Sequence, residues 1–185
     1  CGVGLNNAIA TGVNMLGNVH GGAGEQALAL YYDIEDRMDR HDLTVNEAAE
    51  EAVGAFEAKG GKYVPGFGHR FHKNGDPRAP ALMAMVREAA DAGTVGGRFA
   101  DIGEAVEAHL ADTKGKPVPM NIDGATAVIF GELGCAPPLA RGLFCLSRSV
   151  GILAHAWEQT QQGGRNKGPT PPGYRWTYER SHLDD

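Results

Sequence analysis

The segment from Pro137 to Gln162 constrains the fold more than any other part of the sequence. Two prolines open it, Gly163 and Gly164 close it, and the residues between them are spaced as in one long helix. Its middle, from Leu143 to Leu153, is apolar on most faces. A helix with this pattern is typical of a buried position, so we expect deep burial there.

Helix signals recur along the rest of the chain, whereas strand signals are nearly absent. Residues 44–47 read Thr-Val-Asn-Glu, a capping box that opens a helix, and Asp76 followed by Pro77 is a second helix start. Apolar periodicity and these boundaries predict helices over residues 5–16, 25–38, 45–59, 77–93, 99–112, 123–134 and 137–162. The predicted fold class is therefore all-α.

The apolar residues are unevenly distributed, which predicts two domains. Residues 23–135 form short helices rich in alanine and glutamate, while residues 1–22 and 136–185 are more apolar. We therefore expect a small helical domain over 23–135, inserted into a larger helical domain to which the flanking segments belong. The chain opens on a cysteine within a helix-like run, so we also expect a further segment upstream.

Composition and charge exclude several classes of partner. Apolar residues make up 42% of the chain and charged residues 22%, which is typical of a soluble globular protein. The net charge of −6 disfavours general nucleic-acid binding, so a polyanionic ligand would need a local basic cluster. No stretch has the length of a membrane span and no secretory signal is present. Three cysteines without a CxxC pair predict a reduced, cytoplasmic protein.

Three polar segments interrupt the helices, and each holds a residue suited to chemistry. His69 lies in a glycine-flanked loop that leads to Arg78 at a helix start, an arrangement that suits a small anion. His20, among paired glycines, is either a capping or loop histidine or a residue close to a bound molecule. Asp123 is either a helix N-cap or a carboxylate in an apolar wall, with its pKa raised toward that of a useful general base.

Two arginines are candidates for anion binding. Arg148 is the only charged residue between Arg141 and Glu158 in the long helix, so its guanidinium must pair with a carboxylate of the protein or of a ligand. Arg78 is either a solvated residue of a first helical turn or part of a site for a carboxylate or phosphate.

Signatures of other enzyme classes are missing from the sequence. His69 and His72 form an HxxH pair without a third ligand nearby, so no metal is expected. There is no GxSxG elbow, no GxxxxGK[ST] phosphate loop and no GxGxxG that opens a helix after a strand. The hydrolase, NTPase and dehydrogenase interpretations therefore lack support.

Together these polar segments resemble the citrate synthase family. Residues 18–23 (NVHGGA) resemble its PLHGGA loop, and residues 65–78 resemble its PGFGHRVYKxxDPRA signature. Residues 121–123 (NID) resemble its NVD motif, and residues 144–155 resemble its FxxxRxxGxxAH helix. The resemblance implies an all-α citrate synthase-like fold, a homodimer, and a chain that corresponds to roughly the C-terminal two-thirds of such a protein.

The resemblance also implies a reaction that makes or breaks the carbon–carbon bond between acetyl-CoA and oxaloacetate. Asp123 would remove a methyl proton from the coenzyme A thioester, His20 would stabilise the enol, and His69 would donate a hydrogen bond to the oxaloacetate carbonyl. The residues implied for the substrate carboxylates are Arg78, Arg148 and, across the dimer, Arg165. Those implied for coenzyme A, here a substrate, are Val64, Pro65, Gly66, Gly68, Lys73 and Asn121.

Two departures from the family pattern leave the direction of the reaction open. A further oxaloacetate-binding histidine of the family would fall upstream of residue 1, and an RPR-like motif is replaced by residues 161–169 (QQGGRNKGP). The flanks of Arg165 resemble the citryl-CoA lyase branch, so cleavage of citryl-CoA to acetyl-CoA and oxaloacetate is the favoured reaction. Citrate synthase, an acyltransferase of the tricarboxylic acid cycle, and methylcitrate synthase are the alternatives. A non-catalytic relative that binds coenzyme A or a tricarboxylate is the alternative of another class, although it would not need a base such as Asp123.

Overall fold

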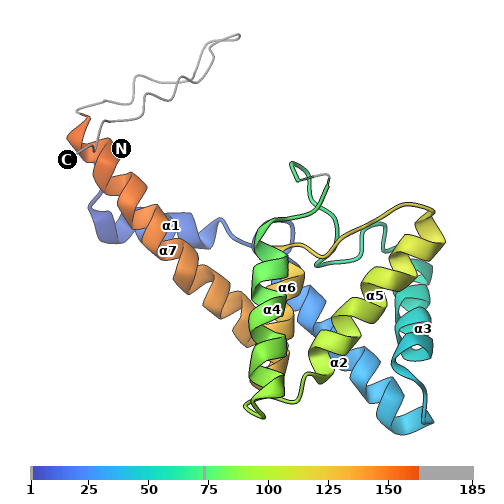
Figure 1. Cartoon of the computed structure of the whole chain (residues 1–185). Coiled ribbons are helices and arrows are strands. Elements are labelled where there is room, and N and C mark those ends of the chain that lie inside the picture. Colours follow the sequence, from blue (N-terminus) through green and yellow to red (C-terminus); the bar gives the residue numbers. More distant parts are fainter. Residues whose placement is uncertain (1, 73, 163–185) are drawn as a thin grey trace.

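The computed structural model describes residues 2–72 and 74–162, and there the chain is all-α, as predicted (Figure 1). The only strand-like pairings among these residues are isolated bridges between Gly17 and Gly21 and between Phe67 and Met120. The helices are α1 (Leu5–Asn14), α2 (Ala23–His41), α3 (Val45–Ala58), α4 (Arg78–Asp91), α5 (Arg98–Lys114), α6 (Ile122–Glu132) and α7 (Pro137–Gln161).

Two helix starts follow the sequence signals closely. The capping box of α3 is formed, because the Thr44 hydroxyl accepts a hydrogen bond from the Glu47 N–H while the Glu47 carboxylate accepts one from the Thr44 N–H at 2.9 Å. Helix α4 begins one residue later than predicted, with Pro77 as the N-cap rather than the first helical residue. Asp76 still caps this helix chemically, since its Oδ1 accepts the Arg78 N–H at 3.1 Å.

The start of α6 tests the N-cap interpretation of Asp123. Asn121 is the N-cap, because its Oδ1 accepts hydrogen bonds from the N–H groups of Asp123 at 2.9 Å and Gly124 at 3.3 Å. The N-cap interpretation of Asp123 is therefore wrong. Its carboxylate lies in the first turn of α6 and is not used to cap that helix.

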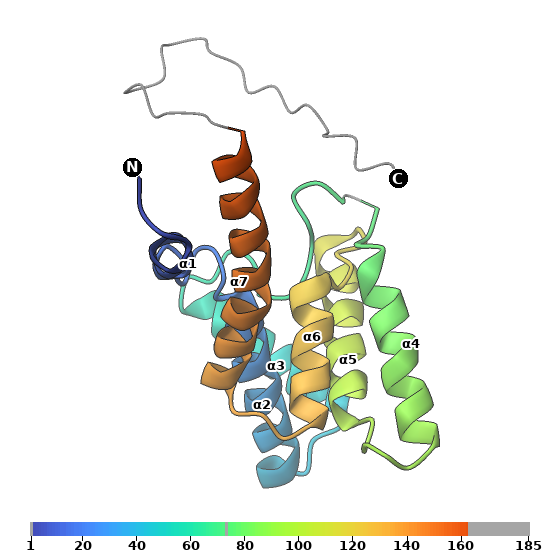
Figure 2. The same ribbon diagram turned by 90° about the vertical axis from the view of Figure 1, so that its left-hand side faces the viewer.

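The core lies where α2 packs against α3, α5 and α6 (Figures 1 and 2). One face of each helix supplies side chains that are completely or almost completely buried: Leu28, Tyr31, Ile34, Val53, Ile102, Val106, Leu110 and Val128. Helix α4 covers α6 from the side away from α2. Helices α2 to α6 thus form one packed body that holds the helix starts of α2, α4 and α6 in place.

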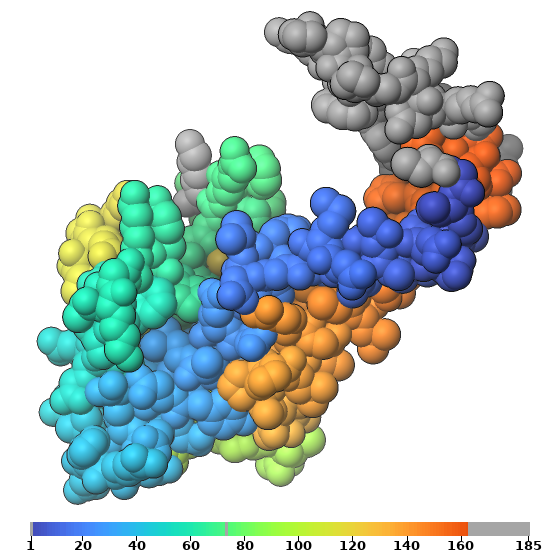
Figure 3. Space-filling view, turned by 180° about the vertical axis from the view of Figure 1, so that it is seen from behind, coloured from blue at the N-terminus to red at the C-terminus, as the bar shows by residue number. Residues whose placement is uncertain are grey.

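Helix α7 is less buried than its sequence predicts. It packs on α1 and α2 and projects with α1 from the body of α2 to α6, as Figure 3 shows from behind. The side chains of Leu146 and Val150 are 67% and 68% exposed, and Trp157 is 55% exposed. Deep burial of residues 143–153 is therefore wrong for the described part of the chain, because neighbouring helices cover α7 on one side only. The exposed apolar residues of this helix, called the α7 stripe below, are Leu139, Leu146, Val150, Leu153 and Trp157.

None of the helices in residues 2–72 and 74–162 combines the length and apolar character that crossing a membrane requires.

Candidate active site

Asp123 lies where the polar segments at the starts of α2, α4 and α6 converge. Gly24 in the first turn of α2 faces it so closely that a Cβ at this position would lie 4.0 Å from the Asp123 Oδ1. Burial raises the pKa of Asp123 above its usual value, as the apolar sequence around it predicts. Arg78, His20 and His69 are near enough for positive charge on them to oppose this rise in pKa, while the negative charge of Asp76 adds to it. The structure therefore brings His20, His69, Arg78 and Asp123 to one place.

The loop that carries His69 is fastened directly to the start of α6. The Gly66 carbonyl accepts the Asn121 N–H at 2.9 Å, and the Asn121 side-chain amide donates to the Gly68 carbonyl at 2.6 Å. The Gly68 N–H donates to the Pro119 carbonyl at 2.7 Å. Gly66 has a φ of +90°, and a Cβ there would lie 2.8 Å from the Cα of Gly124. Only glycine allows this approach, which fixes the His69 loop against the helix of Asp123.

The hydrogen bonds of His69 define which nitrogen of its ring carries a proton. Its Nδ1 accepts the backbone N–H groups of Phe71 and His72, both at 3.1 Å. An imidazole nitrogen that accepts hydrogen bonds has no proton of its own, so the pattern assigns the proton to Nε2. His69 therefore presents an N–H donor, which is what polarising a carbonyl oxygen requires.

His20 is exposed in the loop before α2 and is held by contacts with α7. The His20 carbonyl accepts the Gly17 N–H at 2.8 Å, which closes the loop. Its ring meets the Phe144 ring edge-on, with 6.5 Å between centroids and 87° between planes. The Arg148 guanidinium lies 5.3 Å from the centroid of the same Phe144 ring. Phe144 thus contacts both His20 and Arg148.

Arg148 differs from its sequence-based prediction in burial and pairing. It is exposed, and no carboxylate within residues 2–72 and 74–162 forms an ion pair with it. The aromatic face of Phe144 is its neighbour instead. Arg148 does not need a carboxylate partner, because its guanidinium is exposed. It is exposed because neighbouring helices cover α7 on one side only.

Arg141, which no sequence motif singles out, joins α7 to the His20 loop. It forms an ion pair with Glu25 in the first turn of α2, and its Nη2 donates to the Asn18 Oδ1 at 2.6 Å. Arg141 belongs to no sequence motif, and its acidic partner is far away in the sequence. The sequence alone therefore does not identify this link.

Asp76 is the most extensively hydrogen-bonded carboxylate near the site. Its side chain is completely buried, and its Oδ1 accepts the Arg78 N–H at 3.1 Å and the Arg78 Nε–H at 2.9 Å. Its Oδ2 accepts the Arg78 Nη2–H at 2.8 Å and the Ile122 N–H at 3.0 Å. The hydrogen bonds from Arg78 hold the pKa of Asp76 well below its usual range. The sequence predicts Asp76 as a helix cap but not as a link between α4 and α6.

The residues expected to contact coenzyme A differ in how far they are buried. Val64 and Gly66 are buried, whereas Pro65 and Gly68 are half-buried in the same loop. The side chain of Asn121 is buried and occupied by the cap of α6 and by Gly68. Lys73 and Arg165 lie outside the described residues.

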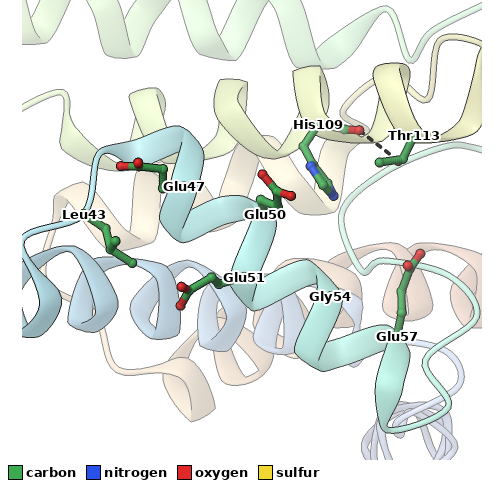
Figure 4. A pocket seen from close by; sticks show the side chains of 8 residues that line it. All are labelled: Leu43, Glu47, Glu50, Glu51, Gly54, Glu57, His109 and Thr113. Atoms are coloured by element: carbon green, nitrogen blue, oxygen red, sulfur yellow. Dashed lines mark hydrogen bonds between the residues drawn. The ribbon is translucent and has the colours of Figure 1, made fainter.

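A hollow lies between α3 and α5 and shares no residue with this site (Figure 4). Half of its lining residues are glutamates, and the full lining comprises Leu43, Glu47, Glu50, Glu51, Gly54, Glu57, His109 and Thr113. Within residues 2–72 and 74–162, no group of three or more His, Cys, Asp or Glu side chains could hold a metal ion.

Comparison with known sequences identifies relatives over nearly the whole chain. The family model described as "Citrate synthase, C-terminal domain" matches residues 2–170. Citrate synthase 1 of Mycobacterium tuberculosis is 32% identical over 188 aligned positions, which cover 97% of this chain and 41% of that protein. The citrate synthase of Haloferax volcanii is 29% identical, over 84% of this chain and 38% of that protein. The chain thus spans about two fifths of the length of these citrate synthases.

Solved structures show the same likeness. The citryl-CoA lyase of Hydrogenobacter thermophilus has a TM-score of 0.71 and 29% identity, covering 94% of this chain and 68% of that one. The citrate synthase of Thermoplasma acidophilum, solved as a ternary complex with carboxymethyl coenzyme A and oxaloacetate, has a TM-score of 0.63 and 25% identity. It covers 91% of this chain and 42% of that one.

Proposed function

Because the chain belongs to the citrate synthase family, we propose that the full-length protein makes or breaks the carbon–carbon bond between acetyl-CoA and oxaloacetate. The observation that carries this proposal is the position of Asp123, a carboxylate with a raised pKa that has His20, His69 and Arg78 around it. A weakly acidic carbon needs both a base and donors that stabilise the charge which develops on oxygen. The site contains both kinds of group.

In the direction of bond formation, Asp123 takes a proton from the methyl carbon of the acetyl thioester. His20 stabilises the oxygen of the resulting enolate, whose carbon attacks the keto carbon of oxaloacetate. The alkoxide that forms on the keto oxygen is stabilised by a hydrogen bond from Nε2–H of His69 and takes its proton from solvent. In the direction of cleavage the hydroxyl proton of citryl-CoA leaves to solvent while the Nε2–H of His69 holds the alkoxide, the carbon–carbon bond breaks, and protonated Asp123 gives its proton to the methyl carbon.

Arg78 and Arg148 hold the carboxylates of the four-carbon acid in this proposal. Arg78 begins α4, where the helix dipole adds to its positive charge, and its side chain is 52% exposed although Asp76 anchors it. Arg148 is exposed beside His20 through their shared contact with Phe144. Arg165 completes the set from a second copy of the chain. Coenzyme A contacts the loop of Val64, Pro65, Gly66 and Gly68, together with Lys73, and Asn121 holds this loop on α6 through the hydrogen bond to Gly68.

We propose cleavage of citryl-CoA as the natural direction. The likeness to the Hydrogenobacter citryl-CoA lyase supports it, since this chain covers 68% of that protein. Citrate synthase activity is the second candidate and is favoured by the curated relatives, which are named citrate synthases. Methylcitrate synthase activity is the third, because one extra methylene changes pocket preference by only about 1–3 kcal/mol.

A product assay on the full-length protein separates these candidates. The protein is supplied with citryl-CoA, with acetyl-CoA plus oxaloacetate, and with propionyl-CoA plus oxaloacetate, and the products are identified by mass spectrometry. Acetyl-CoA from citryl-CoA without free citrate identifies a lyase, whereas citrate or methylcitrate identifies the respective synthase. Binding of coenzyme A or citrate without turnover identifies the non-catalytic alternative and refutes the proposal.

We also propose a cytoplasmic homodimer in which residues 23–135 form the small domain and the α7 stripe is covered in the assembled protein. The stripe supports this, because Leu146, Val150 and Trp157 expose apolar surface on one side of a single helix. Light scattering on the full-length protein measures its oligomeric state directly. A monomer with full activity would contradict the dimer and the role of Arg165 across it.

A further inference from the structure

Asp76 is the buried charge to which the proposed reaction gives no part. Its side chain has no exposed surface, and its two oxygens together accept hydrogen bonds from two helix starts: Oδ1 from Arg78, and Oδ2 from Arg78 and Ile122. A carboxylate is retained in such a place only when its partners compensate for the loss of water. Here the partners are the backbone N–H and the guanidinium of Arg78, the first residue of α4, and the backbone N–H of Ile122, the first residue of α6.

The hydrogen bonds to Arg78 fix the direction of its guanidinium. Asp76 accepts Nε–H at 2.9 Å and Nη2–H at 2.8 Å, so it contacts the guanidinium at two points. Two hydrogen bonds fix the orientation of the planar guanidinium, which a single point charge would leave free to rotate. Arginine has more N–H donors than these, so donors remain on the side that Asp76 does not cover. A guanidinium held in this way loses little freedom when a carboxylate binds to its open side.

The hydrogen bond to Ile122 fixes the position of the base. Ile122 is the first residue of α6, and its N–H would have no partner within the helix. Asp76 accepts this N–H at 3.0 Å, and Asp123 is the next residue. One carboxylate therefore sets the distance between Arg78 and the helical turn that carries Asp123.

We propose that Asp76 is a positioning residue that holds Arg78 and the start of α6 in register, so that the four-carbon acid and Asp123 meet correctly. This inference rests on the proposed function, because it assumes that Arg78 binds the acid. Asp76 touches no substrate in this account. It acts through Arg78 and through the backbone of α6.

Asp76 also contributes negative charge to the surroundings of Asp123. The groups that face Asp123 are Arg78 from α4, His20 and His69 from their loops, and Asp76 itself. Of these, Asp76 alone favours the protonated form of Asp123, while positive charge on the others favours the ionised form. Removing the charge of Asp76 also leaves Arg78 less neutralised, so both effects lower the pKa of Asp123.

The test compares Asp76→Asn with Asp76→Glu in the full-length protein. Asp76→Asn keeps the size of the side chain but loses the charge and one acceptor, whereas Asp76→Glu keeps the charge and moves it by one methylene. Asp101→Asn is the matched control, since Asp101 of α5 is an exposed carboxylate that pairs with Arg87 of α4 at 2.7 Å. Steady-state kinetics are measured across pH for the four-carbon acid and for the thioester, and oxaloacetate binding is measured by calorimetry.

We expect Asp76→Asn to raise KM and Kd for oxaloacetate by roughly 10- to 100-fold, because the guanidinium is no longer oriented. KM for the thioester should change much less. The acid limb of kcat for bond formation should move to lower pH, because the pKa of Asp123 falls. Asp76→Glu should weaken oxaloacetate binding without that pH shift, and Asp101→Asn should change neither.

Equal changes in KM for both substrates, or an unshifted pH profile in Asp76→Asn, would overturn the inference. Failure of both Asp76 variants to fold, while Asp101→Asn folds, would assign Asp76 to stability alone and overturn it too. Oxaloacetate binding by an inactive wild-type protein that weakens in Asp76→Asn would refute the reaction but support the positioning of Arg78. A wild-type protein that neither binds oxaloacetate nor turns over would refute both.

Discussion

Replacing Asp123 with asparagine should lower activity without lowering stability. The amide has nearly the size of the carboxylate but cannot accept a proton from carbon. General-base catalysis contributes roughly 100- to 10,000-fold, so kcat should fall by about that factor. KM should change little, because the groups proposed to hold the substrate are Arg78 and Arg148 rather than Asp123.

The same substitution should leave the folded state intact or make it slightly more stable. Asn121 caps α6 through backbone N–H groups, and those are unchanged by Asp123→Asn. The loss of a negative charge in the first turn costs about 0.3–1 kcal/mol through the helix dipole. Burial opposes this cost, because it raises the pKa of Asp123 and so disfavours the ionised carboxylate in the folded state.

The pH dependence of stability follows from the direction of this shift in pKa. The folded state holds the proton of Asp123 at pH values where the unfolded chain, with a pKa of about 3.9, has released it. Burial of Asp123 therefore costs no stability below that pH and costs progressively more as pH rises through the pKa of the folded state. The midpoint temperature of thermal unfolding of Asp123→Asn should therefore rise relative to that of the wild type as pH increases. Calorimetry of both proteins between pH 4 and 8 measures this difference.

Asp112→Asn, an exposed position on α5, serves as the control and should change neither turnover nor unfolding. Near-normal kcat in Asp123→Asn would remove Asp123 as the base. A loss of activity accompanied by a loss of stability at every pH would show that Asp123 supports the fold instead of acting as the base.

Other substitutions test the scaffold and the assembly. Gly66→Ala should destabilise the protein by about 1–3 kcal/mol in a denaturant titration, because a Cβ at φ +90° would lie 2.8 Å from Gly124; an unchanged midpoint would contradict the close approach. Thr44→Ala should cost about 1 kcal/mol by loss of the capping box and leave kcat unchanged, so a fall in kcat would show that α3 influences the site. The double variant Leu146→Glu, Val150→Glu should lower the mass measured by light scattering, and an unchanged dimer would exclude the α7 stripe from the interface.

The local order of the chain could be predicted from sequence because helix ends carry chemical signals. Thr44 and Glu47 form the capping box that their spacing predicts, and the proline-rich start of α7 lies where expected. The convergence of His20, His69 and Asp123 could be predicted only through the resemblance to a family. Nothing in their spacing fixes how three helix starts meet in space.

Burial and pairing could not be predicted in the same way, because they depend on neighbours distant in the sequence. The apolar middle of α7 predicts burial, but among the described residues only α1 and α2 cover that helix. Asp76 looks like a helix cap, and its second hydrogen bond to Ile122 depends on how α4 and α6 pack. Asn and Asp both suit a helix cap, so the sequence alone could not decide between Asn121 and Asp123. The backbone geometry makes Asn121 the cap of α6.

In the proposed reaction Asp123 moves a proton to and from the methyl carbon of the thioester. The most direct test is exchange of the acetyl-CoA methyl protons with deuterated water in the full-length protein, followed by mass spectrometry. Malate is added, since it is a four-carbon dicarboxylate without the keto group that accepts the carbon nucleophile. We predict exchange in the wild-type protein and its loss in Asp123→Asn. Exchange at equal rates in both proteins, or turnover without any exchange in the wild type, would contradict the claim.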